Sequence, residues 1–111
     1  MRIALAQINT TVGDLDGNAA LMLDAARRSV AGGAELVIFP ELSLTGYPPR
    51  DLVEKPSFLE RTEQHLQRLA AEASGLDCAL VCGYVGRSAA VSAKGATNSA
   101  AIRDGGKVLF R

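Results

Sequence analysis

Short apolar runs alternate along the chain with stretches of helical periodicity. Residues 2–8 and Leu36 to Phe39 are apolar at nearly every position, a pattern typical of buried strands. Between them, apolar residues recur at helical spacing from Asn18 to Val30. Asp16 is the expected N-cap of this helix, and Gly32-Gly33 is its expected end. Two strands joined by a helix predict a βαβ unit with parallel strands.

The second half of the chain predicts a further helix, a strand and a hairpin. Pro56 suits the first turn of a helix that extends over about Ser57 to Ala73. Asp77 to Val85 is apolar on both faces, so it is expected to be central in a covered sheet. Asp-Gly between two strand-like runs, Thr97 to Arg103 and Lys107 to Phe110, is a strong hairpin signal. The fold class is therefore α/β, in the order β-α-β-α-β-β.

Two loops separate these elements. The segment from Leu42 to Lys55 holds Gly46 and Pro48-Pro49, which restrict the conformations that it can adopt. It is either an ordinary surface loop with stiff turns or a pre-ordered active-site loop with Tyr47 turned inward, and local chemistry favours the first. Arg87 to Ala96, rich in Ser, Ala and Gly, is expected to be a mobile loop.

Composition narrows the possible partners and locations. The chain has 111 residues, 48% of them hydrophobic, with a formal net charge of zero, as expected for one globular domain. A balanced charge argues against binding to nucleic acid or to an anionic membrane. No run approaches the ~20 apolar residues of a membrane span. The first apolar run has the length of a strand rather than of a secretory signal, so we expect a cytoplasmic protein.

The sequence gives little support for a zinc site, a phosphate-binding loop, a serine nucleophile or a catalytic cysteine or histidine. One histidine and two cysteines make a poor zinc site, and the glycine-rich phosphate loops and the G-x-S-x-G turn are missing. Cys78 and Cys82 fall inside the central strand, where a thiol is usually a small core residue. His65 is expected at the edge of the buried face of its helix, and no carboxylate or nucleophile stands at a spacing that singles it out.

Glu41 is the strongest candidate for chemistry. It follows the second strand at once, beyond Pro40, and sites of α/β sheets gather at the carboxyl ends of the strands. A glutamate acts as a general base only when its surroundings bring its pKa near the working pH and a nucleophile lies within reach. The residues alone therefore indicate an α/β domain with a candidate glutamate site and no convincing nucleophile.

Two strings of residues identify a family resemblance. Phe39-Pro40-Glu41-Leu42, followed by Leu44-Thr45-Gly46-Tyr47-Pro48, resembles the nitrilase, or carbon-nitrogen hydrolase, superfamily. Tyr47-Pro48-Pro49-Arg50-Asp51-Leu52 is similar to the N-terminal glutaminase domain of glutamine-dependent NAD synthetases. Cys82-Gly83 and Asn98-Ser99-Ala100 extend the match, so that it covers the whole chain.

The resemblance implies a catalytic Glu-Lys-Cys triad. It places the glutamate on Glu41 as general base, and it suggests Tyr47 as a substrate-binding residue. The family's cysteine attacks the glutamine amide and releases ammonia, while its lysine stabilises the oxyanion. Lys94, Lys107 and the two cysteines do not match the family's lysine and cysteine positions, so only one member of the triad is identified in residues 1–111.

The resemblance also implies a fold, a context and partners. The family fold is a four-layer αββα sandwich, of which residues 1–111 are expected to form the N-terminal portion, with open sheet edges and apolar faces. Glutamine is the implied substrate of the complete domain, ATP and Mg²⁺ are implied only for a synthetase domain that this chain lacks, and the family is homo-oligomeric. We expect the chain alone to be inactive. The alternatives are part of another nitrilase-type amidase or a non-catalytic α/β module that completes its sheet with a partner.

Overall fold

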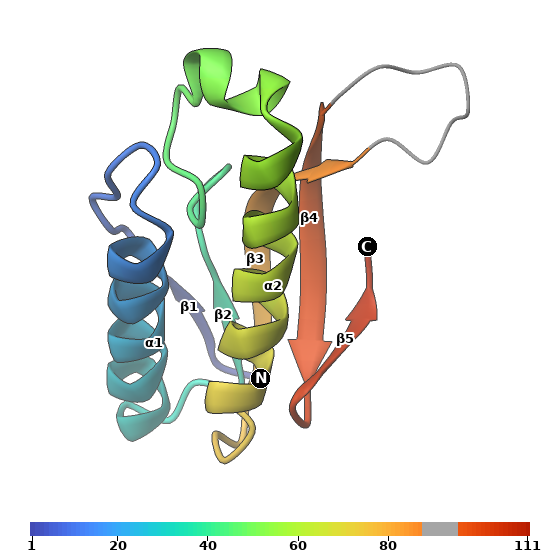
Figure 1. Ribbon diagram of the computed structural model, residues 1–111. Coiled ribbons are helices and arrows are strands. Elements are labelled where there is room, and N and C mark those ends of the chain that lie inside the picture. Colours follow the sequence, from blue (N-terminus) through green and yellow to red (C-terminus); the bar gives the residue numbers. More distant parts are fainter. Residues whose placement is uncertain (88–95) are drawn as a thin grey trace.

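The computed structural model describes residues 1–87 and 96–111 and confirms the predicted order of elements. These are β1 (Ile3–Leu5), α1 (Leu15–Ala31), β2 (Leu36–Ile38), the 3-10 helix η1 (Arg50–Glu54), α2 (Pro56–Glu72), β3 (Ala79–Arg87), β4 (Ala96–Asp104) and β5 (Lys107–Phe110). One sheet carries the strands in the order β1-β2-β3-β4-β5. The first three strands are parallel, and β4 and β5 are antiparallel to their neighbours (Figure 1).

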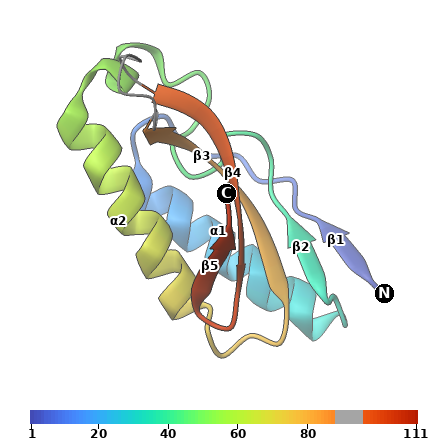
Figure 2. The ribbon, with the colours of Figure 1, turned by 90° about the vertical axis from the view of Figure 1, so that its right-hand side faces the viewer.

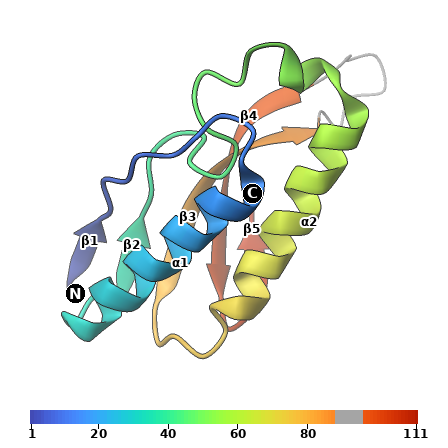
Figure 3. The same cartoon turned by 60° about the vertical axis from the view of Figure 1, so that its left-hand side comes forward.

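The two helices lie on the same face of the sheet (Figures 1 and 2). Figure 3 shows α1 and α2 side by side in front of the strands. Their buried side chains meet those of the strands in one apolar core, because each helix turns its apolar stripe inward. The centre of this core is formed by Met22 and Ala26 of α1, Leu66 and Leu69 of α2, Val37 of β2, and Leu80 and Cys82 of β3.

The N-terminal cap of α1 differs from the prediction. The helix begins at Leu15, and its N-cap is Asp14, whose Oδ1 accepts a hydrogen bond of 3.0 Å from the Gly17 backbone N–H. Asp16 was expected in that role, but it lies within the first turn, where its side chain is free for a tertiary contact. The other end agrees with the sequence, since the helix ends at Ala31 and Gly33 follows with a φ of +89°.

The first strand is less buried than its apolar run predicts. Only Ile3–Leu5 pairs as a strand, and Ile3 and Leu5 are 51% and 76% exposed. The prediction assumed that both faces are covered, whereas β1 is an edge strand and these side chains lie on the face away from the helices. The same face is apolar on other strands, where Ile102 and Leu109 are also exposed. An open apolar face and edge agree with the expectation for part of a layered sandwich.

The hairpin and the second helix agree with the sequence. Gly105 and Gly106, with φ of +56° and +80°, form the turn between β4 and β5, as a two-residue hairpin loop requires. The second helix begins with Pro56 at its first helical position. The loop expected over Arg87 to Ala96 lies outside the described residues, apart from its two ends, which belong to β3 and β4. No helix in the described ranges combines the length and the apolarity needed to cross a membrane.

Candidate active site

Glu41 lies at the carboxyl edge of the parallel strands, as predicted. It follows the last residue of β2, Ile38, by one short turn, and its side chain is exposed. The antiparallel strand β4 brings its first residues to the same edge, because Asn98 pairs with Val85 near the end of β3. The edge therefore joins the turn after β2, the end of β3 and the start of β4, which is a usual place for a site in such sheets.

The segment just after Glu41 is buried rather than on the surface. Residues 42–46 are all buried, and hydrogen bonds hold their backbone on several sides. Leu44 N–H donates to the Gly83 carbonyl at 3.1 Å, and Gly13 N–H donates to the Thr45 carbonyl at 3.0 Å. Of the two interpretations of this loop, the ordinary surface loop is wrong for residues 42–46. The inward orientation of Tyr47 is also wrong, because its side chain is 67% exposed and lies past the buried part.

The backbone is unusual at Leu42, directly after Glu41. Leu42 has a φ of +50°, in the left-handed region that side chains other than glycine rarely adopt. Such a conformation costs of order 1–3 kcal/mol and persists where the surrounding packing enforces it. Leu42 is buried in a small cluster with Leu59 of α2 and Val85 of β3, which supplies that packing. The direction of the Glu41 side chain is thus set by a strained turn that tertiary contacts hold in place.

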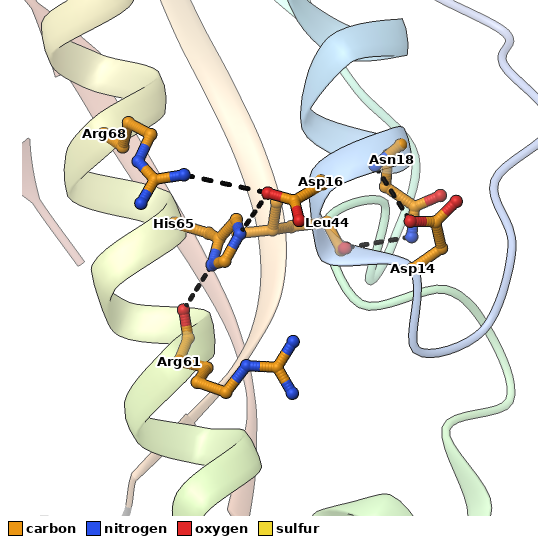
Figure 4. A network of polar contacts seen from close by, with 8 residues as sticks. Asp14, Asp16, Asn18, Leu44, Arg61, His65 and Arg68 are labelled. Atoms are coloured by element: carbon orange, nitrogen blue, oxygen red, sulfur yellow. Dashed lines mark hydrogen bonds and ion pairs between the residues drawn. The ribbon is translucent and has the colours of Figure 1, made fainter.

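A buried asparagine ties this segment to the start of α1. The Asn18 side-chain N–H₂ donates to the carbonyls of Thr11, at 2.8 Å, and Leu44, at 3.0 Å, while its oxygen accepts from the Thr11 N–H at 2.8 Å. Figure 4 shows Asn18 reaching from the first turn of α1 toward Leu44. Since Asn18 is 1% exposed and its bond to Leu44 is buried, that bond satisfies polar groups that water does not reach.

The carboxylate of Glu41 has one side-chain partner among the contacts of the described residues, the amide of Asn98, whose Nδ2 donates to Oε1. Sequence reasoning did not find this pair. Asn98 was noted only as part of the family match, and 57 residues separate it from Glu41. The hairpin signal predicts only that β4 and β5 are antiparallel, and it does not specify which strand lies on the other side of β4.

The remaining candidate residues lie elsewhere. Lys107 pairs with Asp104 at the hairpin end of β4, whereas Asn98 lies toward its other end. Lys94 is outside the described residues. Cys78 and Cys82 are buried in the core, and burial raises the pKa of the Cys82 thiol to about 12 and also raises the pKa of Cys78. This placement agrees with the prediction that both cysteines are core residues rather than nucleophiles.

His65 has a structural partner that the sequence did not reveal. Its Nε2 lies 2.8 Å from Asp16 Oδ1 and its Nδ1 lies 2.7 Å from the Arg61 carbonyl, so the ring joins α2 to α1 (Figure 4). The Arg61 carbonyl oxygen and the Asp16 carboxylate oxygen both accept hydrogen bonds. The ring donates to both only when each of its nitrogens carries a proton. The His65 hydrogen bond, followed by the charges of His65 and Arg68, lowers the pKa of the Asp16 carboxyl.

The site as described can hold a carboxylate in a fixed place and accept a proton on it. Within the described ranges, no three His, Cys, Asp or Glu side chains gather in a group that could hold a metal ion. The surroundings of Glu41 supply a backbone turn and a neutral amide donor. This arrangement suits a general base that serves a nucleophile contributed by another part of a protein.

Comparison with known proteins identifies the class. The carbon-nitrogen hydrolase family matches residues 2–110, and the chain belongs to this family. Its α/β fold, with a mixed five-stranded sheet and two helices, matches part of nitrilase-fold domains. Within the family, the chain is homologous to the N-terminal glutaminase domain of glutamine-dependent NAD synthetases.

Three relatives illustrate the similarity. The glutamine-dependent NAD(+) synthetase of Thermotoga maritima is 37% identical over 109 residues, which are 98% of this chain and 18% of that protein. The crystal structure of the Cytophaga hutchinsonii glutamine-dependent NAD(+) synthetase has a TM-score of 0.85 at 27% identity, over 97% of this chain and 18% of that one. An amidase from Nesterenkonia sp. has a TM-score of 0.77 at 30% identity, over 98% of this chain and 40% of that one. The chain thus spans less than a fifth of the synthetases and two fifths of the amidase.

Proposed function

We propose that residues 1–111 contribute the general base, Glu41, to a glutaminase site that supplies ammonia to a glutamine-dependent NAD synthetase. The observation that carries this proposal is the position of the Glu41 carboxylate. It lies at the carboxyl edge of the sheet, on a turn held by buried contacts, with one oxygen bound by Asn98. A base needs this combination of fixed position and access to a proton donor.

The proposed reaction uses Glu41 to accept the proton of a cysteine thiol supplied by the rest of the domain. The thiolate attacks the amide carbon of glutamine, the C–N bond breaks, and ammonia leaves with a proton returned to its nitrogen. Water then hydrolyses the thioester to glutamate and restores the thiol. A lysine of the family stabilises the oxyanion in both steps. Tyr47 remains a candidate for substrate binding, since its side chain is exposed and it follows the buried segment after Glu41.

The ATP and Mg²⁺ of such synthetases are not assigned to residues 1–111. The sequence has no glycine-rich phosphate loop, and the described residues offer no group of metal ligands. We place both with a synthetase domain, which is also where the ammonia would be consumed. Residues 1–111 are proposed to be the N-terminal portion of the glutaminase domain.

Ammonia release by the full-length gene product that contains residues 1–111 tests this function. Glu41→Gln removes the base while keeping the shape, and we expect kcat to fall by about 10²- to 10⁴-fold. Glu35→Gln, at the opposite end of β2, is the matched control and is expected to retain activity. The polypeptide of residues 1–111 alone is expected to release no ammonia above the blank. Full activity of Glu41→Gln contradicts the proposal.

A second candidate is an amidase that acts on simple amides. It is favoured by the likeness to the Nesterenkonia amidase, whose mutants have been solved with acrylamide and with butyramide. The same assay separates the two, because a glutaminase releases ammonia from glutamine and leaves butyramide intact, whereas a simple amidase shows the reverse preference.

A further inference from the structure

We propose that Asn98 is a positioning residue for Glu41: its side-chain amide fixes the carboxylate so that one oxygen is bound and the other is directed to the substrate. The proposal rests on the proposed function of Glu41 as a base, and it assigns a role to a residue on a different strand. The bond runs from Asn98 Nδ2 to Glu41 Oε1, between the start of β4 and the turn after β2.

The orientation of the amide follows from the chemistry of its partner. An ionised carboxylate only accepts hydrogen bonds, so Asn98 must present its N–H₂ group rather than its oxygen. Oε1 is then occupied, which leaves Oε2 to accept a proton. An amide is also neutral at every working pH. It can therefore hold the carboxylate without the strong ion pair that a lysine or arginine would form, which would make the carboxylate a weaker base.

Both partners are anchored by the same small cluster. Leu42, the residue after Glu41, packs in it with Val85, and Val85 is the residue opposite Asn98 in the β3–β4 pairing. Around Asn98 the backbone of β4 is held by β3, with which it pairs from Ala96 to Arg103, whereas β5 pairs only with Ile102 to Asp104. The hydrogen bond therefore joins two side chains whose backbones are already fixed relative to each other, and little further order is needed to form it.

Glu41 needs such a partner because its side chain is exposed. A glutamate side chain has several rotatable bonds, and in water its carboxylate samples many places. Confining it to one place converts an encounter into a positioned proton transfer, and displacement by about 1 Å can cost about 10²-fold in rate. Asn98 is expected to prevent this displacement. Its removal should therefore lower kcat rather than weaken substrate binding.

NMR on the 111-residue chain tests the contact without any need for activity. We expect the Asn98 side-chain N–H resonances to move with pH, with the same midpoint as the Glu41 carboxyl carbon, and Glu41→Gln to abolish this movement. Asn18 is an internal control, because its amide donates to two backbone carbonyls that do not titrate. Asn98 resonances that do not follow Glu41 would overturn the proposal, whatever the protein is found to catalyse.

Kinetics of the full-length gene product test the role. Asn98→Ala is expected to reduce kcat by about 10- to 100-fold with KM within about twofold. Asn98→Asp places a second carboxylate beside Glu41 and is expected to lose activity most strongly at high pH, where both are charged. Thr97→Val, one residue earlier on β4, is the control for a general effect on the strand.

The outcomes separate the two proposals. An Asn98→Ala enzyme with wild-type kcat, or one affected only in KM, overturns the positioning role even if Glu41 is essential. If the wild-type protein hydrolyses neither glutamine nor simple amides, the proposed function fails, and with it the positioning of a base. The NMR titration still decides whether the two side chains are bonded.

Discussion

The α-carbon of Gly83 on β3 lies directly against the backbone of Leu42, where an added methyl group would stand 2.5 Å from the Leu42 nitrogen. The same methyl group would stand 2.8 Å from the Pro40 carbonyl oxygen. Both obstacles are backbone atoms, which cannot turn aside as a flexible side chain can. Gly83 is thus the position at which the sheet approaches the turn that carries Glu41.

Gly83→Ala is therefore expected to destabilise the protein and to displace this turn. Overpacking of this kind typically costs about 1–3 kcal/mol in the free energy of unfolding, which urea denaturation measures. Gly75→Ala is the control, since a methyl group there meets nothing within 4 Å, and its effect is expected within about 0.5 kcal/mol. Equal stability of the two variants would contradict the close approach.

Asn18→Ala is expected to loosen the segment after Glu41. The substitution removes three hydrogen bonds and leaves the buried Leu44 carbonyl without its partner, whereas the Thr11 carbonyl keeps the Asp14 N–H as a donor. One unsatisfied buried group costs about 1–3 kcal/mol, so we expect a loss of that order in the free energy of unfolding. Hydrogen exchange at the Gly46 amide, which donates to the Leu42 carbonyl, should accelerate.

Asn18→Asp tests whether the amide donors carry this effect. Aspartate keeps the acceptor but cannot donate to the two carbonyls, so it should be about as damaging as alanine. Asn9→Ala, at an exposed position before the same turn, serves as the control and should change little. A stable Asn18→Asp variant would mean that the amide is not what holds Leu44.

The contact between Asp16 of α1 and His65 of α2 predicts that the protein loses stability in acid. The pKa of Asp16 is lowered in the folded protein, chiefly by the His65 hydrogen bond, so its stabilising contribution is present above its unfolded pKa of about 3.9. That contribution is lost as the pH falls through the lower, folded value. Thermal unfolding of wild type and Asp16→Asn should differ at about pH 5 and converge at the acid end.

Asp24→Asn is the control for this experiment. Asp24 pairs with Arg28 at 3.0 Å on the exposed side of α1, so its loss removes a contact within one helix rather than one between two. A difference between wild type and Asp16→Asn that persists unchanged into acid would contradict the role of the ionised Asp16–His65 pair.

Both cysteines are expected to resist alkylation in the folded protein. Cys82 is fully buried and its pKa is raised to about 12, so the reactive thiolate is scarce at about pH 8. Iodoacetamide labelling followed by mass spectrometry should find neither Cys78 nor Cys82 modified under native conditions, and both modified in denaturant. Rapid native labelling of either thiol would show that the core around β3 opens.

Local patterns predicted the elements well because the causes were local. Proline at the start of α2 and the glycines of the β4–β5 turn act through their own backbone preferences, and the structure has both where they were expected. The placement of Glu41 followed in the same way, from a strand that ends just before it. The cap of α1 was misplaced by two residues because both Asp14 and Asp16 are acceptable caps, and only the chain path before the helix selects Asp14.

Arg103 shows what local patterns miss. Arg103 is a charged residue near the end of β4, and nothing in the sequence around it indicates burial. In the structure it is only 1% exposed. Its guanidinium donates to the Ala73 carbonyl, at 3.1 Å from Nη2, at the end of α2. A cation is favourable at that end of a helix, where carbonyl groups lack partners. The contact depends on the end of α2 lying against β4, which neither segment encodes alone.

The sequence by itself determined the order of elements, the family, and the place of Glu41 after the second strand, because periodicity, turn residues and short motifs act over a few neighbouring positions. Only the tertiary structure decided which residues hold Glu41 in place. Asn98, Gly83 and Asn18 come from three different elements and meet the Glu41 turn through packing, register and close backbone approach. It also decided that Tyr47 is exposed and that one face of the sheet is open, since burial depends on what covers a side chain and not on its own chemistry.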